Sequence, residues 1–274
     1  LDEELAQTLL DLKQAGKKLF LATNSEWHYT QPMMSWVFDR FLPGTNWRSL
    51  FDLVIVQARK PSFFDGNAPF HEVIGDAVSA NAHSGPLRHG HCYRGGNAQL
   101  VQEHFGVDGE DILYVGDHVY ADVHVSSQIR RWRTALILRE LEDEVQHELA
   151  FEGDRVRLNQ LMHEKERLDH EQATLRLALL RIDHREAPPS GTATNAHTLH
   201  ERLRALRGES EALDHRIAPL ARAAGELGHA RWGPLMRAGA DKSRLARQIE
   251  RHADVYTSRV SNFLYLTPFG YLRA

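Results

Sequence analysis

The stretch KKLFLATNS, residues 17–25, is typical of a buried strand that ends in polar residues. Short apolar runs recur at FDLVIVQA (51–58), DILYVGD (111–117) and TALIL (134–138), and helical patterns separate them. Apolar strands that alternate with helices favour a doubly wound, parallel α/β sheet. The sequence therefore predicts an α/β core built around these four strands.

The composition narrows the class of protein. Of the 274 residues, 42% are hydrophobic and 26% are charged, which excludes a wholly disordered or fibrous chain. A net charge of −4 gives no basic surface for nucleic acid, and no apolar run is long enough to span a membrane. The single cysteine, Cys92, fits a reducing compartment. We expect a soluble cytoplasmic protein with no nucleic-acid or membrane partner.

The chain divides into three predicted parts. Residues 1–140 form the α/β core, within which the stretch 61–96 breaks the rhythm of strands and helices. Because that stretch is rich in Gly, Pro and His, we interpret it as an inserted hairpin or loop. Residues 141–230 form a helical segment. Residues 231–274 return to the core through a helix over 243–264.

The helical segment carries a heptad pattern in two runs. They are Leu161, Leu168, Leu175 and Ile182, then Leu199, Leu203, Leu206, Leu213, Ile217, Leu220 and Leu227. A turn rich in Pro and Gly at 187–191 separates the runs, which predicts an antiparallel coiled-coil hairpin. Two amphipathic helices packed on the core are the alternative. Pro219 should kink or interrupt the second helix, and the heptads make a homo-oligomer an expectation.

Polar residues follow three of the predicted strands directly. They are Thr23, Asn24, Ser25, Lys60, Asp117 and Asp122. Ligands of parallel sheets bind at the carboxyl ends of the strands. Hydroxyls at a helix start and a lysine suit a phosphate, while two carboxylates five residues apart suit Mg²⁺. Together they predict a phosphoryl-transfer site; a helix cap and a surface turn are the alternatives for the separate motifs.

The order of these motifs resembles motifs two, three and four of the haloacid dehalogenase (HAD) superfamily. Longer strings are similar to the cytosolic purine 5′-nucleotidases, the family that includes the IMP- and GMP-preferring enzymes. These strings are FLATNSEWHYT (20–30), FDLVIVQARKPSFF (51–64), SGPLRHGHCYRGGN (84–97), DILYVGDHVYADV (111–123) and QIERHADVYTSRVSNFLY (248–265). The resemblance covers nearly all of residues 1–140 and about 229–274, and the heptad segment matches least.

The resemblance implies Mg²⁺-dependent hydrolysis of purine nucleoside 5′-monophosphates through an aspartyl-phosphate. In the family, the motif-two Thr and Asn and the motif-three Lys hold the transferring phosphoryl group. Those roles fall on Thr23, Asn24 and Lys60, with Ser25 as a neighbour. The first motif-four aspartate binds Mg²⁺, which falls on Asp117. The second supports the metal shell, which falls on Asp122.

One motif of the family is missing. The nucleophile and the acid/base are aspartates of a DxDxT motif on the central strand, and this sequence contains no DxDxT. We therefore expect the C-terminal portion of a 5′-nucleotidase, inactive by itself. The central strand would lie between the strands at 17–23 and 111–117, so its absence should leave unpaired edges or a closed gap. The alternative is a non-catalytic remnant that binds phosphate or nucleotide, or pairs through its heptads.

Overall fold

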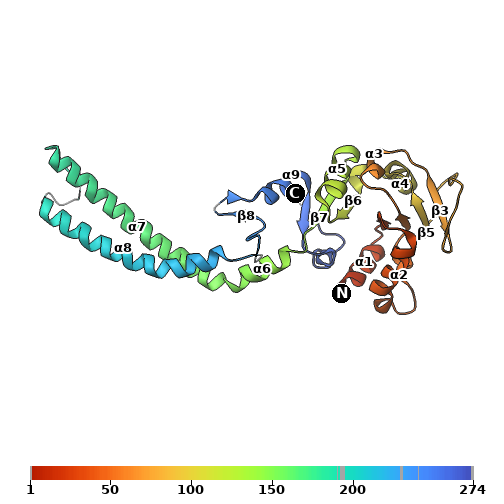
Figure 1. Ribbon diagram of the computed structural model, residues 1–274, viewed down its shortest axis with the longest axis horizontal. Helices are drawn as coiled ribbons and strands as arrows, with labels where there is room; N and C mark the ends of the chain where they lie inside the picture. Colours follow the sequence, from red (N-terminus) through yellow and green to blue (C-terminus); the bar gives the residue numbers. More distant parts are fainter. Residues whose placement is uncertain (1, 190, 192–194, 229–230, 240, 273–274) are drawn as a thin grey trace. The chain divides into compact units, whose positions relative to one another are not determined.

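The computed structural model describes residues 2–189, 191, 195–228, 231–239 and 241–272. The chain forms two compact units (Figure 1). Unit 1 comprises residues 1–141 and 242–274 and has an α/β fold, and unit 2 comprises residues 142–241 and is mainly helical. None of the helices in the described part of the chain is long and apolar enough to cross a membrane.

The first sheet of unit 1 has five strands in the order β1–β2–β5–β3–β4. Their bounds are β1 Phe20–Ala22, β2 Leu53–Val56, β3 Phe70–Ile74, β4 Ala77–Val78 and β5 His91–Gly95. Strands β1, β2 and β5 are parallel, whereas β3 runs antiparallel to both β5 and β4. The sheet is therefore mixed, because the inserted stretch adds antiparallel strands to the predicted parallel ones.

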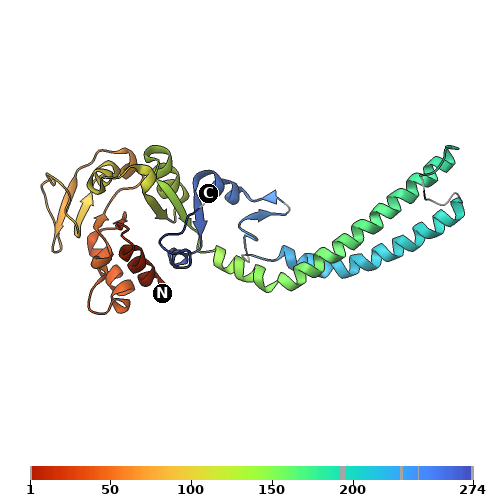
Figure 2. The same ribbon diagram turned by 180° about the vertical axis from the view of Figure 1, so that it is seen from behind.

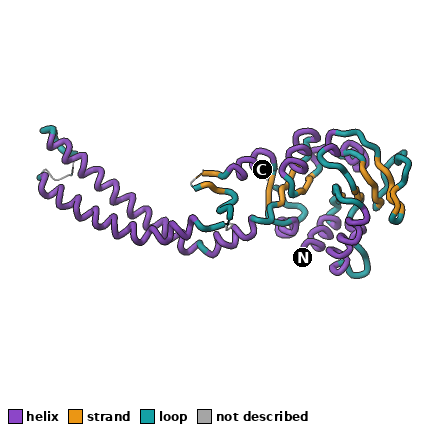
Figure 3. The backbone as a smooth tube through the Cα atoms, viewed as in Figure 1, coloured by secondary structure: helices purple, strands orange, loops and turns teal. Residues whose placement is uncertain are grey.

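The second sheet has three parallel strands in the order β10–β7–β6, drawn in orange in Figure 3. Their bounds are β6 Leu113–Gly116, β7 Arg133–Ile137 and β10 Val255–Thr257. Along the described strands, β1 bonds to β2 alone and β6 bonds to β7 alone. The side chains of the two end strands nevertheless meet, since the rings of Phe20 and Tyr114 lie 6.3 Å apart. The strands predicted at 17–23 and 111–117 thus belong to separate sheets.

Helices of unit 1 connect these strands. They are α1 Glu4–Gln14, α2 Trp27–Phe38, α3 Ser62–Asp65, α4 Ala98–Phe105, α5 Val125–Arg130, α9 Arg244–His252 and α10 Phe263–Leu266, with the short 3₁₀ helices η1 Asp39–Phe41, η2 Trp47–Leu50, η3 Gly109–Asp111 and η5 Val260–Asn262, and the π-helical turn η4 Val119–His124. Local sequence sets their ends. The Asn97 side chain accepts the backbone N–H of Leu100 at 3.1 Å, and Gly106 ends α4 with a φ of 64°.

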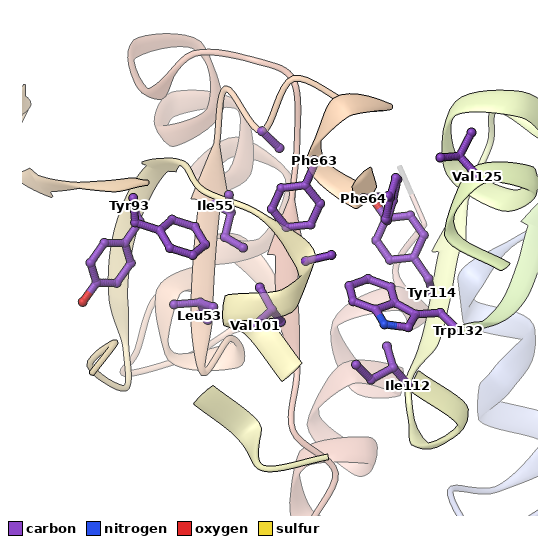
Figure 4. Close-up of a cluster of buried hydrophobic side chains, with 13 residues drawn as sticks. Leu53, Ile55, Phe63, Phe64, Tyr93, Val101, Ile112, Tyr114, Val125 and Trp132 are labelled. Carbon is purple, nitrogen blue, oxygen red and sulfur yellow. The ribbon is translucent and has the colours of Figure 1, made fainter. Parts of the chain in front are cut away.

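The core of unit 1 lies on both faces of β2. Leu53 and Ile55 belong to one buried apolar cluster, and Val54 and Val56 belong to the other. Successive side chains of a strand point to opposite faces, so a strand covered on both sides is apolar throughout. Figure 4 shows the first cluster, in which aromatic rings gather around Tyr114.

Two sequence predictions differ from the structure in unit 1. The stretch 61–96, interpreted as an inserted hairpin or loop, also contains β5, which pairs in parallel with the buried β2. The helix expected over 243–264 ends at His252, and β10 follows because Val255–Thr257 pairs with β7.

Unit 2 contains the predicted helical hairpin. Its helices are α6 Leu141–Ala150, α7 Glu152–Asp183 and α8 Ala196–Gly225, and the short strands β8 Arg237–Ala238 and β9 Asp241–Lys242 follow. Helices α7 and α8 lie side by side in both Figure 1 and Figure 2. Their cross-contacts join Lys165 to Asp214 and Glu171 to Arg202, so the helices run antiparallel.

The heptad leucines form the apolar core between α7 and α8. That cluster includes Leu161, Leu168, Leu175, Leu199, Leu203, Leu206, Leu213 and Ile217. The expected interruption at Pro219 is wrong, because α8 continues through it to Gly225. Ile217 and Leu220 pack in the same cluster on either side of the proline, and this packing outweighs one lost hydrogen bond. Leu227 lies beyond the end of α8.

Candidate functional site

The loops that follow β1 and β2 lie against each other at the carboxyl ends of these strands. The backbone N–H of Ala58 donates to the carbonyl of Thr23, and that of Gln57 donates to the carbonyl of Ser25, both at 2.9 Å. Gln57 and Arg59 adopt left-handed φ values of 45° and 61°, which turn the second loop sharply. This turn directs the chain at Lys60 toward the end of β1.

Asn24 holds the backbone of Lys60 with both polar atoms of its side chain. Its Oδ1 accepts the Lys60 backbone N–H at 2.6 Å, and its Nδ2 donates to the Lys60 carbonyl at 3.1 Å. A side-chain amide used in this way is occupied by the protein itself. The structure therefore places Asn24 where it fixes the lysine loop.

Lys60 forms an ion pair with Asp122 in the turn η4. The Nζ–Oδ1 distance is 2.7 Å, and the two side chains are only 14% and 6% exposed. The second carboxylate oxygen of Asp122 accepts the backbone N–H of His118 at 3.3 Å. A Cβ atom on Gly116 would lie 2.5 Å from the Cβ of Asp122, so glycine is required there. This packing explains why glycine precedes the first of the two aspartates that lie five residues apart, Asp117 and Asp122.

The other predicted site residues also lie just after strands: Thr23 and Ser25 follow β1, and Asp117 follows β6. Asp117 follows β6 directly and is exposed, and its carboxylate forms no ion pair within the described ranges of the chain. The Thr23 hydroxyl accepts the backbone N–H of Ser25 at 3.1 Å, in a local turn just before α2. The structure thus joins Asn24, Lys60 and Asp122 directly, while Asp117 stays free to accept a ligand.

Tyr114 was missed by the sequence analysis. It lies on β6, is buried, and its ring centroid is 5.7 Å from the Nζ of Lys60. Burial raises the pKa of its hydroxyl well above the ordinary value. The charge of Asp122, a side-chain hydrogen bond to Asp122 and the charge of Asp117 add to the rise. The sequence feature that could have identified Tyr114 is its position: a tyrosine hydroxyl within an apolar strand, three residues before Asp117.

The donor set suits a hard cation bound in an open site. Within the described residues, no group of three or more His, Cys, Asp or Glu side chains could enclose a metal ion. Asp117 offers carboxylate oxygens, whereas Asp122 is engaged by Lys60. Mg²⁺ commonly takes one or two carboxylates and completes its shell with waters and substrate phosphate. The residues present are consistent with Mg²⁺ held in that way.

Comparison with known proteins identifies a family and a relative of this chain. The model of a family described as the 5′ nucleotidase family matches residues 1–274. A 5′-nucleotidase domain-containing protein of Dictyostelium discoideum is 27% identical over 271 residues, which are 95% of this chain and 40% of that protein. The chain therefore spans about two fifths of the length of this relative.

Proposed function

This chain belongs to the 5′ nucleotidase family, and on that basis we propose that the protein containing it hydrolyses nucleoside 5′-monophosphates at the carboxyl ends of β1, β2 and β6. The observation that carries the proposal is the meeting of three loops at Lys60. Asn24 comes from the loop after β1, Lys60 from the loop after β2, and Asp122 from the turn after β6. Such a meeting gives the Lys60 ammonium a defined place beside the Asp122 carboxylate.

Lys60 is proposed to offset charge on the phosphoryl oxygens. A compact ammonium that is only 14% exposed acts in surroundings with little water, where its electrostatic effect is large. The Thr23 hydroxyl and the backbone at the start of α2 supply hydrogen bonds to the same oxygens. Asn24 contributes by holding the backbone of Lys60, and Ser25 lies beside it.

Asp117 is proposed to hold Mg²⁺. Asp122 is proposed to stabilise the metal site indirectly, through its contacts with Lys60 and the backbone N–H of His118. When bound, Mg²⁺ would neutralise charge on the transferring phosphoryl group. Asp117 suits this role because its carboxylate is exposed, whereas the carboxylate of Asp122 is buried in its ion pair. The two aspartates of the motif therefore have different tasks.

We propose further that the fold is of the HAD type and that a strand from another part of a longer protein completes it. That strand would carry the nucleophilic aspartate and bond to β1 and β6. Two facts support this arrangement: β1 and β6 are end strands of separate sheets, and the chain spans 40% of its relative. A purine substrate of the IMP or GMP type rests on the similarity of the sequence strings.

The experiment compares phosphate release by this chain and by the product of the complete reading frame, using IMP, GMP, AMP and CMP with and without Mg²⁺. We expect activity in the longer protein alone. Lys60→Met should lower kcat about 100-fold or more, because a charge contact to the phosphoryl group is lost. Asp117→Asn should lower kcat by a similar factor, because the carboxylate that would hold Mg²⁺ is lost. Lys18→Met is the matched control, since that lysine is 65% exposed and pairs with Asp52.

The results of this experiment distinguish an enzyme from a non-catalytic remnant of the family. Equal activity of the Lys60→Met protein and the parent would contradict the assignment of the site. Nucleotide binding without phosphate release, even in the longer protein, would favour the non-catalytic alternative. Activity restricted to pyrimidine nucleotides would keep the reaction and overturn the purine assignment.

A further inference from the structure

Tyr114 lies against the ion pair at the proposed site. Its ring centroid is 5.7 Å from the Lys60 ammonium. The chain reaches this place through β6, whose next residues are Val115, Gly116 and Asp117. One buried side chain therefore connects the strand that carries Asp117 with the loop that carries Lys60.

The ring of Tyr114 is itself held on several sides. The ring centroids of Phe64 and Trp132 lie 5.3 Å and 5.6 Å away, and that of Phe20 lies 6.3 Å away. In Figure 4, Phe64, Tyr114 and Trp132 lie together. Close packing of aromatic rings restricts each ring to a narrow range of orientations. Tyr114 is thus a rigid surface under a flexible lysine.

A lysine needs such support to act at a defined point. Its four-carbon stem is flexible, and holding it in place costs conformational entropy. Asn24 fixes only the backbone of Lys60, and Asp122 contacts the ammonium at a single oxygen, 2.7 Å away. The face of an aromatic ring attracts a cation within about 6 Å. The ring of Tyr114 therefore supplies the second contact that defines the ammonium's place.

We propose that Tyr114 is a positioning residue of this site, which holds the Lys60 ammonium with its ring. Its contribution to turnover rests on the proposed function, because it acts through Lys60. Its effect on the lysine itself is a property of the folded chain. The two claims can therefore be tested apart.

The first test measures the accessibility of Lys60 in this chain. Limited reductive methylation followed by mass spectrometry gives the labelling rate of Lys60 relative to that of Lys18, which is 65% exposed. Tyr114→Leu should raise this ratio about tenfold, because the ring contact is lost. Tyr114→Phe keeps the ring and should leave the ratio within about twofold of that of the parent.

Tyr93→Phe is the matched control. Tyr93 is buried in the same apolar cluster, but its hydroxyl accepts the backbone N–H of Arg88 at 3.0 Å. We expect the Lys60 ratio of this variant to equal that of the parent. A ratio within about twofold of the parent in Tyr114→Leu would overturn the proposal, as would a rise in Tyr93→Phe equal to that in Tyr114→Leu. Tyr114→Phe keeps the packing, so it guards against simple loss of folding.

The second test uses the longer protein and follows kcat and KM separately. Tyr114→Leu should lower kcat about tenfold and leave KM within about twofold, because the misplaced charge acts in the transition state. A change in KM alone would overturn the link to turnover. If the longer protein proves inactive while the labelling ratios change as expected, the proposed function fails and the positioning of Lys60 stands.

Discussion

Replacing Lys60 by methionine should destabilise unit 1 strongly, because it leaves the Asp122 carboxylate buried without its cation. The two side chains are 14% and 6% exposed, so both charges have left most of their water. Breaking a buried pair from one side costs about 3 to 5 kcal/mol. The His118 backbone N–H still bonds to Asp122. We therefore expect the free energy of unfolding to fall by about 3 kcal/mol, the lower end of that range.

A double-mutant cycle isolates the contribution of the pair. Asp122→Asn keeps the size of the side chain and an oxygen that faces the ammonium, so it should cost about 2 kcal/mol. The double variant should cost about 2 kcal/mol as well, since no uncompensated charge stays buried. The sum of the two single-variant costs then exceeds the cost of the double variant by about 3 kcal/mol, and this difference is the expected coupling energy.

The assay is urea unfolding followed by tryptophan fluorescence. Trp132 reports on this region, because its ring lies 5.6 Å from that of Tyr114. The pair Lys242–Glu250 is the control: its N–O distance is also 2.7 Å, but its side chains are 62% and 43% exposed. Its coupling energy should be about 0.3 to 0.5 kcal/mol. A coupling below about 0.5 kcal/mol for the Lys60 pair would refute the reasoning that burial makes it strong.

Three further predictions concern other parts of the chain. Burial lowers the pKa of His104 below its ordinary 6.5, so the unfolded state binds more protons and the free energy of unfolding should fall as the pH drops below about 6.5. His104→Gln should flatten the slope of the unfolding free energy against pH, and an unchanged slope would contradict this cause. Burial raises the pKa of Cys92 to about 12 from 9.0, so at pH 8 its alkylation by iodoacetamide should be about a thousandfold slower than that of a free cysteine, and rapid native-state labelling would disprove this. Leu206→Ala should lower the stability of the hairpin by about 3 kcal/mol in thermal circular dichroism, because the Leu206 side chain is 0% exposed. Leu180→Ala is the control and should change the stability by less than about 0.5 kcal/mol, because that side chain is 56% exposed. Equal effects of the two substitutions would refute the apolar core between α7 and α8.

Local patterns predicted a large part of this molecule. The apolar runs predicted β1, β2, β6 and β7. Strand β2 shows the reason most clearly, because it is buried along its whole length and a strand covered on both faces is apolar throughout. The heptads identified the apolar core between α7 and α8, because the spacing of three and four residues places leucines on one face of a helix. Strands β5 and β10 were missed, since their residues carry no such pattern and pair with buried neighbours from elsewhere in the chain.

The order of residues along the chain is enough to predict that Thr23, Lys60 and Asp117 each follow a strand. The contacts between these loops depend on the tertiary structure. Asn24 bonds to Lys60 across 36 residues of sequence, and Lys60 bonds to Asp122 across 62. No periodic pattern encodes contacts between loops so far apart, because their partners are chosen by the packing of the strands that carry them.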